Sequence, residues 1–391
     1  MEVTIKELGE IITGNTPSKK TEEFWNSEDI CFVKPDIISE NGINEIFESN
    51  EYISEEAKKK ARVVSKDSIF ITCIGSIGKI GIALDGEYAF NQQINAIIPN
   101  DKILPKYLAY NLLYNRSRLI SIANAPVVPI INKSQFSDFA INIDSNKNKQ
   151  LEIVNVLDKL THIIELRNDE LSALDDLIKA RFVEMFWSCE WTTTLGNYIA
   201  ELRGGKSLSG TEECKNKVLK TGAATFGWFD PEQYKYLPKD YKPLSEHRVE
   251  TGDVMISRMN TPELVGACSY VFEAPENMYY PDRLWKVIPK NQANPIFIWQ
   301  LLWDQEIRRQ IKEKSGGTSG TMHNISKQKL LEIKCIDVPV NEQNKFAEFV
   351  IQINKSKIAI QKSLDATRVL LDSLMQKYFG ASMNFKDERR K

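Results

Sequence analysis

The sequence contains few of the residues that build metal sites and disulfide frameworks. Its 391 residues include three histidines and six cysteines. His162, His247 and His323 lie far apart and form no His-x-x-x-His pair, the spacing that places two metal ligands on one helix face. The closest cysteines, Cys189 and Cys214, are too distant for a paired zinc motif. We therefore expect no metal site and no disulfide framework.

Long apolar runs and recognisable catalytic motifs are also missing. The chain has no apolar run of about 18 residues, as a membrane helix would need, and its first ten residues do not resemble a signal peptide, so we expect a cytoplasmic protein. The segment Gly75-Ser76-Ile77-Gly78-Lys79 lacks the glycine spacing and the final hydroxyl residue of a phosphate-binding loop. No Asn-Pro-Pro-aromatic motif occurs, and no glycine-rich cofactor loop opens a βαβ unit. We expect no catalytic site and no cofactor in this chain.

An excess of basic residues is absent as well. Lys and Arg number 51 and Asp and Glu number 53, giving a formal net charge of −2. A protein that binds nucleic acid alone usually has a clear basic excess. If this chain binds DNA, we expect it to do so with local patches and with help from a partner.

Two long stretches with heptad spacing organise the chain. They cover residues 149–188 and 339–380, and the stretch from Lys149 to Trp187, at about 1.5 Å per residue, predicts a helix about 58 Å long. Such helices serve as spacers with an apolar seam, and we expect the two to pair with each other, although pairing with a second copy of the chain is the alternative. The seam residues are Leu157, Leu160, Ile164, Leu171, Leu174, Ile178, Val350, Ile353, Ile360, Leu364, Leu371 and Leu374.

An internal repeat accompanies the two helices. Segments of the first half recur in order in the second half, which indicates a duplicated architecture. The matched pairs are Leu8-Gly9 with Leu195-Gly196, residues 66–71 with 251–256, residues 97–99 with 287–289, residues 131–133 with 325–327, and Gln150 with Gln343.

The repeat predicts an α+β protein with two structurally similar α/β domains joined by two long antiparallel helices that form a coiled coil. Short strands with Gly, Asn, Asp and Pro turns alternate irregularly with a few helices, which favours a strongly bent sheet over a doubly wound fold. The predicted parts are a first domain at 1–148, a helix at 149–188, a second domain at 189–338, a helix at 339–380 and a disordered tail at 381–391.

Polar and basic residues on the predicted turns of both domains are candidates for DNA binding. Arg and Lys read guanine, Asn and Gln read adenine, and Lys, Ser and Thr hold phosphates. Each residue alone could equally belong to an ordinary solvated loop, but their recurrence at matching places favours binding. The candidates are Thr16, Ser18, Lys19, Lys20, Ser76, Lys79, Gln92, Gln93, Lys133, Arg203, Lys206, Arg258, Asn260, Arg283, Thr318, Ser319, His323 and Lys327.

Several motifs together resemble the specificity subunits of type I restriction-modification systems. In order along the chain they are the Gly14-x-Thr16-Pro17-Ser18 turn, the run Gly75 to Gly81, the stretch Gly316 to Lys327, Pro339-x-x-Glu342-Gln343, and the helix end Tyr378-Phe379-Gly380. The resemblance covers essentially the whole chain.

The resemblance implies a non-catalytic, DNA-binding adaptor. Each variable domain would be a target-recognition domain that reads one half of a bipartite double-stranded DNA sequence, and the helices would set the spacing and dock two modification (methyltransferase) subunits. Restriction (motor-nuclease) subunits would complete the complex, with S-adenosylmethionine, ATP and Mg bound in those partners. The alternatives are the specificity subunit of a related two-subunit system, a coiled-coil scaffold without DNA binding, and an enzyme with a degenerate site. No residue-to-base code gives the target sequence.

Three features depart from the family pattern. The first helix lacks an entry proline, so we expect Asp144 or Ser145 to cap it. Residues 258–261 replace the Gly-Ser-Ile-Gly run of the first domain, which leaves the equivalent of Lys79 open. Polar residues also interrupt the seam, and we expect them to fix the helix register. They are Arg167, Arg181 and Lys357.

Overall fold

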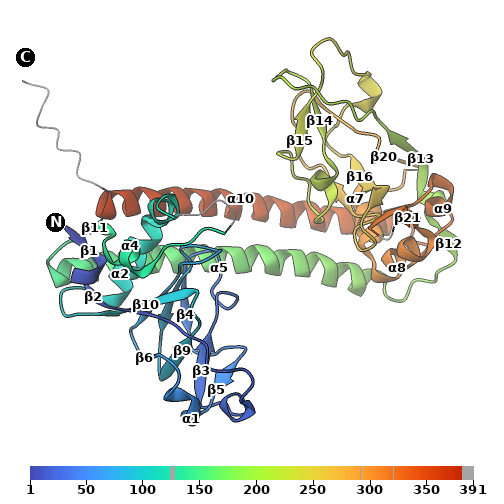
Figure 1. Cartoon of the computed structure of the whole chain (residues 1–391). Helices are drawn as coiled ribbons and strands as arrows, with labels where there is room; N and C mark the ends of the chain where they lie inside the picture. The colour runs from blue at the N-terminus through green and yellow to red at the C-terminus, as the bar shows by residue number, and fades with distance from the viewer. Residues whose placement is uncertain (124–127, 291, 320, 381–391) are drawn as a thin grey trace, which may run out of the picture. The chain divides into compact units, whose positions relative to one another are not determined.

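The computed structural model divides the chain into two units, and it describes residues 1–380 apart from 124–127, 291 and 320. The first unit comprises Met1–Asn168 with Lys362–Lys391, and the second comprises Asp169–Gln361. Each long helix therefore contributes one part to each unit (Figure 1). The predicted tail at 381–391 lies outside the described residues.

The first unit is built around a five-stranded sheet in the order β2-β10-β7-β8-β4 and a four-stranded sheet in the order β5-β3-β9-β6. A short pair, β1 with β11, ties the first residues of the chain to the segment before the long helix. The elements are β1 (Glu2–Thr4), β2 (Gly9–Thr13), β3 (Ile30–Val33), β4 (Ile43–Ile46), β5 (Tyr52–Ile53), α1 (Glu55–Lys58), β6 (Val63–Ser65), β7 (Ile69–Thr72), β8 (Ile80–Ala83), β9 (Glu87–Phe90), β10 (Ile94–Pro99), α2 (Pro105–Tyr114), α3 (Arg116–Ser121), α4 (Lys133–Ser137) and β11 (Ala140–Asn142).

The second unit has a four-stranded central sheet in the order β13-β20-β16-β18 and two three-stranded sheets, β15-β14-β19 and β17-β22-β21. The elements are β12 (Thr193–Thr194), α6 (Leu195–Tyr198), β13 (Ile199–Gly204), β14 (Lys217–Leu219), β15 (Tyr234–Tyr236), β16 (Val254–Ser257), β17 (Met259–Asn260), β18 (Cys268–Tyr270), β19 (Met278–Tyr279), β20 (Leu284–Pro289), α7 (Pro295–Trp303), α8 (Gln305–Lys314), β21 (Gly316–Ser319), β22 (Met322–Asn324), α9 (Lys327–Leu331) and β23 (Lys334–Cys335).

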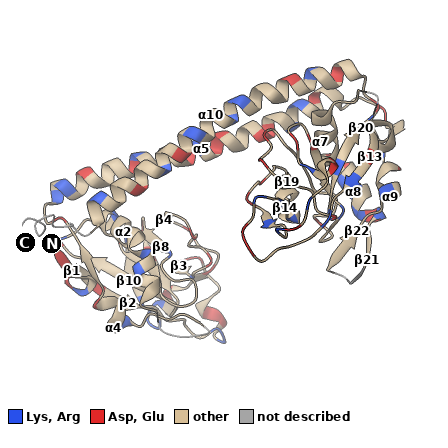
Figure 2. Ribbon diagram, turned by 90° about the horizontal axis from the view of Figure 1, so that it is seen from above, with Lys and Arg blue, Asp and Glu red and all other residues tan. Residues whose placement is uncertain are grey.

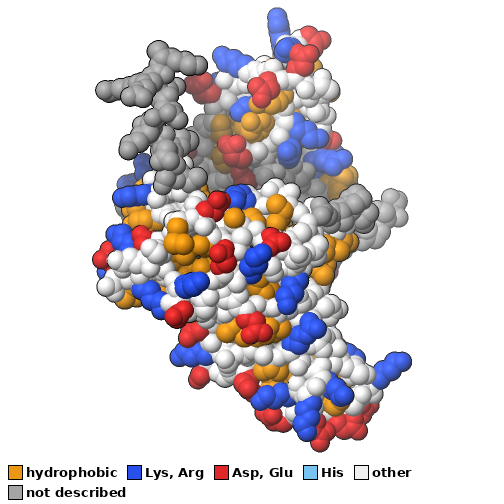
Figure 3. All heavy atoms as spheres, turned by 60° about the vertical axis from the view of Figure 1, so that its left-hand side comes forward, with side chains coloured by type: hydrophobic (Ala, Val, Ile, Leu, Met, Phe, Trp, Pro, Cys, Tyr) orange, Lys and Arg blue, Asp and Glu red, His pale blue; other side chains and the backbone are white. Residues whose placement is uncertain are grey.

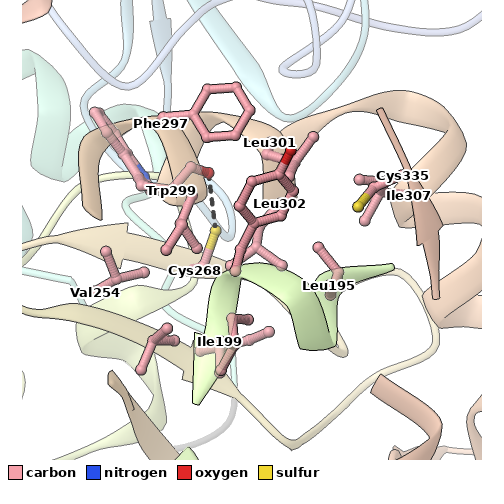
Figure 4. Close-up of a cluster of buried hydrophobic side chains, with 14 of the residues drawn as sticks. Leu195, Ile199, Val254, Cys268, Phe297, Trp299, Leu301, Leu302, Ile307 and Cys335 are labelled. Atoms are coloured by element: carbon pink, nitrogen blue, oxygen red, sulfur yellow. Dashed lines mark hydrogen bonds between the residues drawn. The ribbon is translucent and has the colours of Figure 1, made fainter. Parts of the chain in front are cut away.

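Each central sheet is covered on one face by helices. In the second unit, apolar side chains of α7 and α8 meet those of β13, β16 and β18 (Figure 4). Phe297, Leu301 and Ile307 are fully buried there, and α7 starts with Pro295 at the position where a missing N–H costs nothing. The mixture of short strands and helices in two repeated units confirms the predicted α+β class.

The two long helices are α5 (Lys147–Phe186) and α10 (Val340–Phe379), each of 40 residues. In the first unit, Leu157 near the start of α5 belongs to the same buried cluster as Met375 near the end of α10. In the second unit, Phe182 near the end of α5 meets Phe346 near the start of α10, with ring centroids 5.4 Å apart. The helices therefore run antiparallel within each unit. Charged residues of both signs alternate along them (Figure 2).

The predicted seam residues lie at positions of α5 and α10 where the side chains are shielded from solvent. Leu157, Val350 and Leu364 are almost fully buried, and the other nine predicted seam residues are buried or half-buried. The adjacent residues Ile351 and Ile358 are exposed. None of the helices in the described part of the chain is long and apolar enough to cross a lipid bilayer.

The cap of α5 differs from our expectation. The helix begins at Lys147, two residues earlier than predicted, and the side chain of Asn146 accepts the hydrogen bonds of Asn148 N (2.9 Å) and Lys149 N (3.3 Å). Asp144 instead accepts from the backbone of Asn146 (2.9 Å). The prediction of Asp144 or Ser145 as the cap was wrong because the helix starts before the first apolar residue of its heptads.

The repeat is visible in equivalent hydrogen bonds at the start of both helices. The amide oxygen of Gln150 accepts from Leu104 N (2.8 Å), and that of Gln343 accepts from Asn294 N (2.9 Å). The predicted match of these two glutamines is confirmed. Each ties the start of its long helix to the residue that precedes an earlier short helix, α2 in the first unit and α7 in the second.

The predicted match of Leu8 with Leu195 was wrong by three residues. The carbonyl of Leu8 accepts from Asn100 N (2.8 Å), and the equivalent bond runs from Lys290 N to the carbonyl of Tyr198 (2.8 Å). Leu8 therefore corresponds to Tyr198. The Leu-Gly dipeptides misled the sequence comparison because Leu8-Gly9 follows a short helical turn, whereas Leu195-Gly196 begins one.

Candidate nucleic-acid interface

In the second unit, backbone hydrogen bonds bring three distant segments together at one end of the central sheet. Arg258, directly after β16, donates its N–H to the carbonyl of Arg283 (3.0 Å) and accepts from Ile325 N (3.0 Å). Arg283 directly precedes β20, and Ile325 directly follows β22. The predicted candidates around residues 258, 283 and 323–327 therefore lie on neighbouring backbone segments.

A three-stranded sheet extends this end of the unit. Strand β17 pairs with β22, placing Asn260 opposite His323, and β22 pairs with β21, which contains Thr318 and Ser319. Gly317 permits the close approach of these strands, because a Cβ there would lie 1.9 Å from the carbonyl oxygen of Met322.

Side-chain contacts hold several of these candidates in place. Arg258 donates from Nε to the carbonyl of Asp282 (2.8 Å) and pairs with its carboxylate (3.4 Å). His323 Nδ1 is hydrogen-bonded to Ser315 Oγ (2.9 Å), and Asn260 accepts from Thr261 N (2.9 Å). These contacts restrict the rotamers of Arg258, Asn260 and His323 before any ligand binds, which lowers the entropic cost of binding.

A cluster of cations adjoins this group. Arg203 pairs with Glu201 (2.7 Å), and Lys327 lies over the Trp285 ring at 5.9 Å. The pKa of Glu201 is lowered, first by the hydrogen bond from Arg203 and to a smaller extent by the charge of Lys327. Lys206 is exposed and forms no ion pair or side-chain hydrogen bond among the described residues, and the same holds for Arg283. These two cations are therefore available to phosphates or base edges.

The first unit has the same backbone bonds at the same end of its sheet. Cys73 donates to the carbonyl of Gln93 (2.8 Å) and accepts from Ile131 N (2.9 Å). Gln93 thus corresponds to Arg283. Lys133, two residues after Ile131, corresponds to Lys327, two residues after Ile325. Candidates chosen by residue type and by their recurrence on predicted turns thus occupy equivalent positions in the two units.

A hydroxyl contact is also shared by the two units. Thr16 Oγ1 donates to Gln92 Oε1 (2.8 Å), and Ser207 Oγ donates to a carboxylate oxygen of Asp282. Sequence reasoning missed Ser207. The available signal was its place two residues after Gly205, as Thr16 stands two residues after Gly14.

Both of these glycines are required by close backbone contacts. A Cβ on Gly14 would lie 2.2 Å from the carbonyl oxygen of Asn91, and one on Gly205 would lie 1.9 Å from that of Tyr280. The glycines fix where the chain turns after β2 and after β13, and so they fix the place of the two hydroxyl residues.

Lys79 lies in a different environment from the other candidates. Only 12% of its side chain is exposed, and its ammonium donates to the carbonyl of Pro35 (3.2 Å) and pairs with Glu40 (3.5 Å). Gly78 and Gly266 share a left-handed backbone (φ +78° and +75°) and equivalent bonds to the preceding strand. Lys79 therefore corresponds to Ala267, and its contacts indicate a structural role.

The turn after β2 carries the remaining candidates of the first unit. Lys19 pairs with Glu51 (2.7 Å) and lies over the Trp25 ring at 4.3 Å, whereas Ser18 accepts from Lys20 N (3.3 Å). Lys20 in this turn is exposed, and so is Ser76, which lies between β7 and β8. On the face of the molecule shown in Figure 3, cationic and anionic side chains are interspersed.

No three side chains of His, Cys, Asp or Glu gather to form a metal site within residues 1–380 as far as they are described. The polar groups at the sheet ends are donors and acceptors of hydrogen bonds, with cations beside them. That combination suits recognition of base edges and phosphates.

Comparison with known proteins agrees with this geometry. The family model for the type I restriction modification DNA specificity domain matches twice, at residues 1–175 and 197–367. The chain is 31% identical over 195 residues to the specificity subunit of the type I restriction enzyme EcoR124I/EcoR124II of Escherichia coli, covering 45% of this chain and 47% of that protein. It is 29% identical over 187 residues to the HindI specificity subunit of Haemophilus influenzae, covering 46% and 40%. The aligned part thus spans about half the length of these relatives, or less.

Two solved structures share the fold. The type I restriction-modification S subunit of M. genitalium has a TM-score of 0.58 at 19% identity, covering 97% of this chain and 96% of that one. A structure described as showing complex assembly of a type I system has a TM-score of 0.56 at 14% identity, covering 97% of each chain. With two matches of the family model over most of its length, the chain belongs to the family of type I restriction-modification DNA specificity proteins.

Proposed function

We propose that this chain selects the DNA sequence on which a type I restriction-modification complex acts. The observation that carries the proposal is the shared hydrogen-bonded frame at the sheet end of each unit. Equivalent positions of this frame hold different side chains, for example Gln93 in the first unit and Arg283 in the second, and we expect these side chains to read bases. A duplicated frame with different side chains is what a bipartite target of two different half-sites requires.

The two long helices would serve the same function. Their pairing would join the two units, and their register would set the gap between the two half-sites. Exposed apolar residues on the outer faces, such as Leu166 and Val369, would dock two modification subunits. The restriction subunits would join that complex, and the whole would act in the cytoplasm.

Chemistry would belong to the partners. We expect a modification subunit to flip the target adenine from the duplex and methylate it from S-adenosylmethionine, because base chemistry requires extrusion of the base into a pocket. ATP and Mg would act in the restriction subunit. The net charge of −2 favours weak DNA binding by the isolated chain and stronger binding by the complex.

Co-expression with a modification subunit from the same system tests the proposal. Single-molecule sequencing of the host DNA should then show methylated adenines in one bipartite motif with a fixed gap. A stable complex that produces no methylated motif and selects no DNA sequence in vitro would favour the coiled-coil scaffold instead.

A further inference from the structure

The hydroxyl contact shared by the two units points to the residues that discriminate bases. It joins Thr16 to Gln92 in the first unit and Ser207 to Asp282 in the second. Gln92 precedes Gln93 just as Asp282 precedes Arg283, and these followers occupy equivalent places in the backbone frame. In both units a hydroxyl group donates the hydrogen bond. The acceptor is an amide oxygen in the first unit and a carboxylate oxygen in the second.

In the first unit, the contact between Thr16 and Gln92 leaves the amide nitrogen and one oxygen lone pair of Gln92 without a partner among the described residues. Because Thr16 donates to Gln92 Oε1, the oxygen end of the amide is held toward Thr16. The Nε2 end makes no hydrogen bond among the described residues, and the oxygen keeps a second lone pair. Gln92 is exposed. An amide presented in this way can donate to adenine N7 and accept from adenine N6, the bidentate pattern that glutamine makes with adenine.

The carboxylate contact has a different consequence in the second unit. Asp282 accepts from Ser207, and its backbone N–H also donates to Ser207 Oγ (3.2 Å). Asp282 in turn holds Arg258 by the two contacts described above, while Nη1 of Arg258 has no hydrogen-bond partner in the described part of the chain. The chain Ser207–Asp282–Arg258 therefore orients a guanidinium, and guanidinium groups read guanine.

The first unit cannot present an arginine at the equivalent place. The residue corresponding to Arg258 is Cys73, whose side chain is 3% exposed and accepts from Asn95 Nδ2 (3.2 Å). One unit thus offers an amide, and the other offers a guanidinium, from the same frame.

We propose that Thr16 and Ser207 are positioning residues for base discrimination, with Gln92 reading an adenine in the first half-site and Arg258 reading a guanine in the second. This inference rests on the proposed function. It adds the base class read at one position of each half-site and the hydroxyl groups that set it.

The test uses the complex with the modification subunit and duplexes carrying its mapped motif, with each base pair replaced singly. Wild-type complex should discriminate against replacement of one A·T pair in the first half-site by about five- to 150-fold. Thr16→Ala and Gln92→Ala should abolish discrimination at that pair alone, and Thr16→Ser should restore it. In the second half-site, Ser207→Ala and Arg258→Met should do the same at one G·C pair, with Ser207→Thr as the rescue.

Ser121→Ala is the matched control, since it also removes an exposed hydroxyl that donates a hydrogen bond, here to the carbonyl of Arg118 (2.7 Å). It should leave discrimination at every pair unchanged. The positioning role of Thr16 and Ser207 would be overturned if Thr16→Ala and Ser207→Ala kept full discrimination between base pairs. An equal loss of discrimination at all base pairs would also overturn it. Absence of any motif for the wild-type complex would refute the proposed function itself, so the two failures are distinguishable.

Discussion

Side chains at the sheet end of each unit divide into groups that face solvent and groups that hold the fold. Lys20 is exposed without an ion pair in the described residues, whereas Lys79 is enclosed between Pro35 and Glu40. Residue type alone suggested both as DNA contacts. The difference depends on which loop folds over the lysine, and a segment 40 residues away in sequence supplies that loop.

This pair of lysines gives opposite predictions. Lys20→Met should weaken binding of the complex to all DNA sequences alike and lower the slope of log affinity against log salt by about one, with no change in thermal stability. Lys79→Met should lower the free energy of unfolding by about 1 kcal/mol, because it loses a hydrogen bond and an ion pair, and should leave the salt slope unchanged. Titrations at several salt concentrations with thermal melts measure both. A reduced salt slope for Lys79→Met would contradict the structural role.

A buried ionic group in the second unit predicts a pH-dependent effect. Lys286 pairs with Asp253 (2.9 Å), and Tyr280 donates to the same carboxylate (3.2 Å). The pKa of Asp253 is raised, chiefly because burial disfavours its charged form, while Lys286 opposes that shift. Removing Lys286 would leave a buried carboxylate without its cation.

Lys286→Met should therefore lower the free energy of unfolding by about 3 to 5 kcal/mol near neutral pH. A carboxyl group whose folded pKa is raised favours folding when it is protonated, so the loss should shrink as the pH falls through that pKa. Urea unfolding at pH 8 and pH 5 measures the change, with the exposed Lys290→Met as the control. An equal loss at both pH values would show that the Asp253 charge is not its cause.

At the scale of elements, hydrophobic periodicity was sufficient to predict both long helices to within two residues at each end. It could not identify the cap of α5, because Asp144, Ser145 and Asn146 are all competent and only the backbone geometry selects Asn146. The matched segments 66–71 and 251–256, continued by two residues, already place Cys73 opposite Arg258. Their side chains share no property, but the backbone hydrogen bonds at the sheet end agree with this match.

The helix seam predicts a strong contrast between neighbouring residues. Val350 is fully buried against the second unit's core, and Ile351 is 41% exposed on the other side of α10. Val350→Asp should lower the free energy of unfolding by about 4 kcal/mol or more, since it buries an unpaired charge, whereas Ile351→Asp should change it by about 0.5 kcal/mol or less. Thermal melting of the two variants measures the contrast. Similar melting of both would contradict the observed orientation of α10.

At the scale of the whole molecule, the duplication could be predicted from the sequence because strands and helix starts recur in order. The half-sites could not be predicted from the sequence, because each unit presents its own side chains on the shared frame. The hydrogen-bond partners of these side chains come from loops that are distant in sequence. Thr16 with Gln92 and Ser207 with Asp282 illustrate this, since only folding brings either pair together.

The most direct test of independent half-site recognition exchanges residues 1–148 for the corresponding region of another family member with a different known motif. The exchanged chain is co-expressed with its modification subunit, and methylated adenines are mapped across the host DNA. We expect one half of the bipartite motif to change to that of the donor, while the other half and the gap remain. A change in both halves, or an unchanged motif, would contradict the assignment of one half-site to each unit.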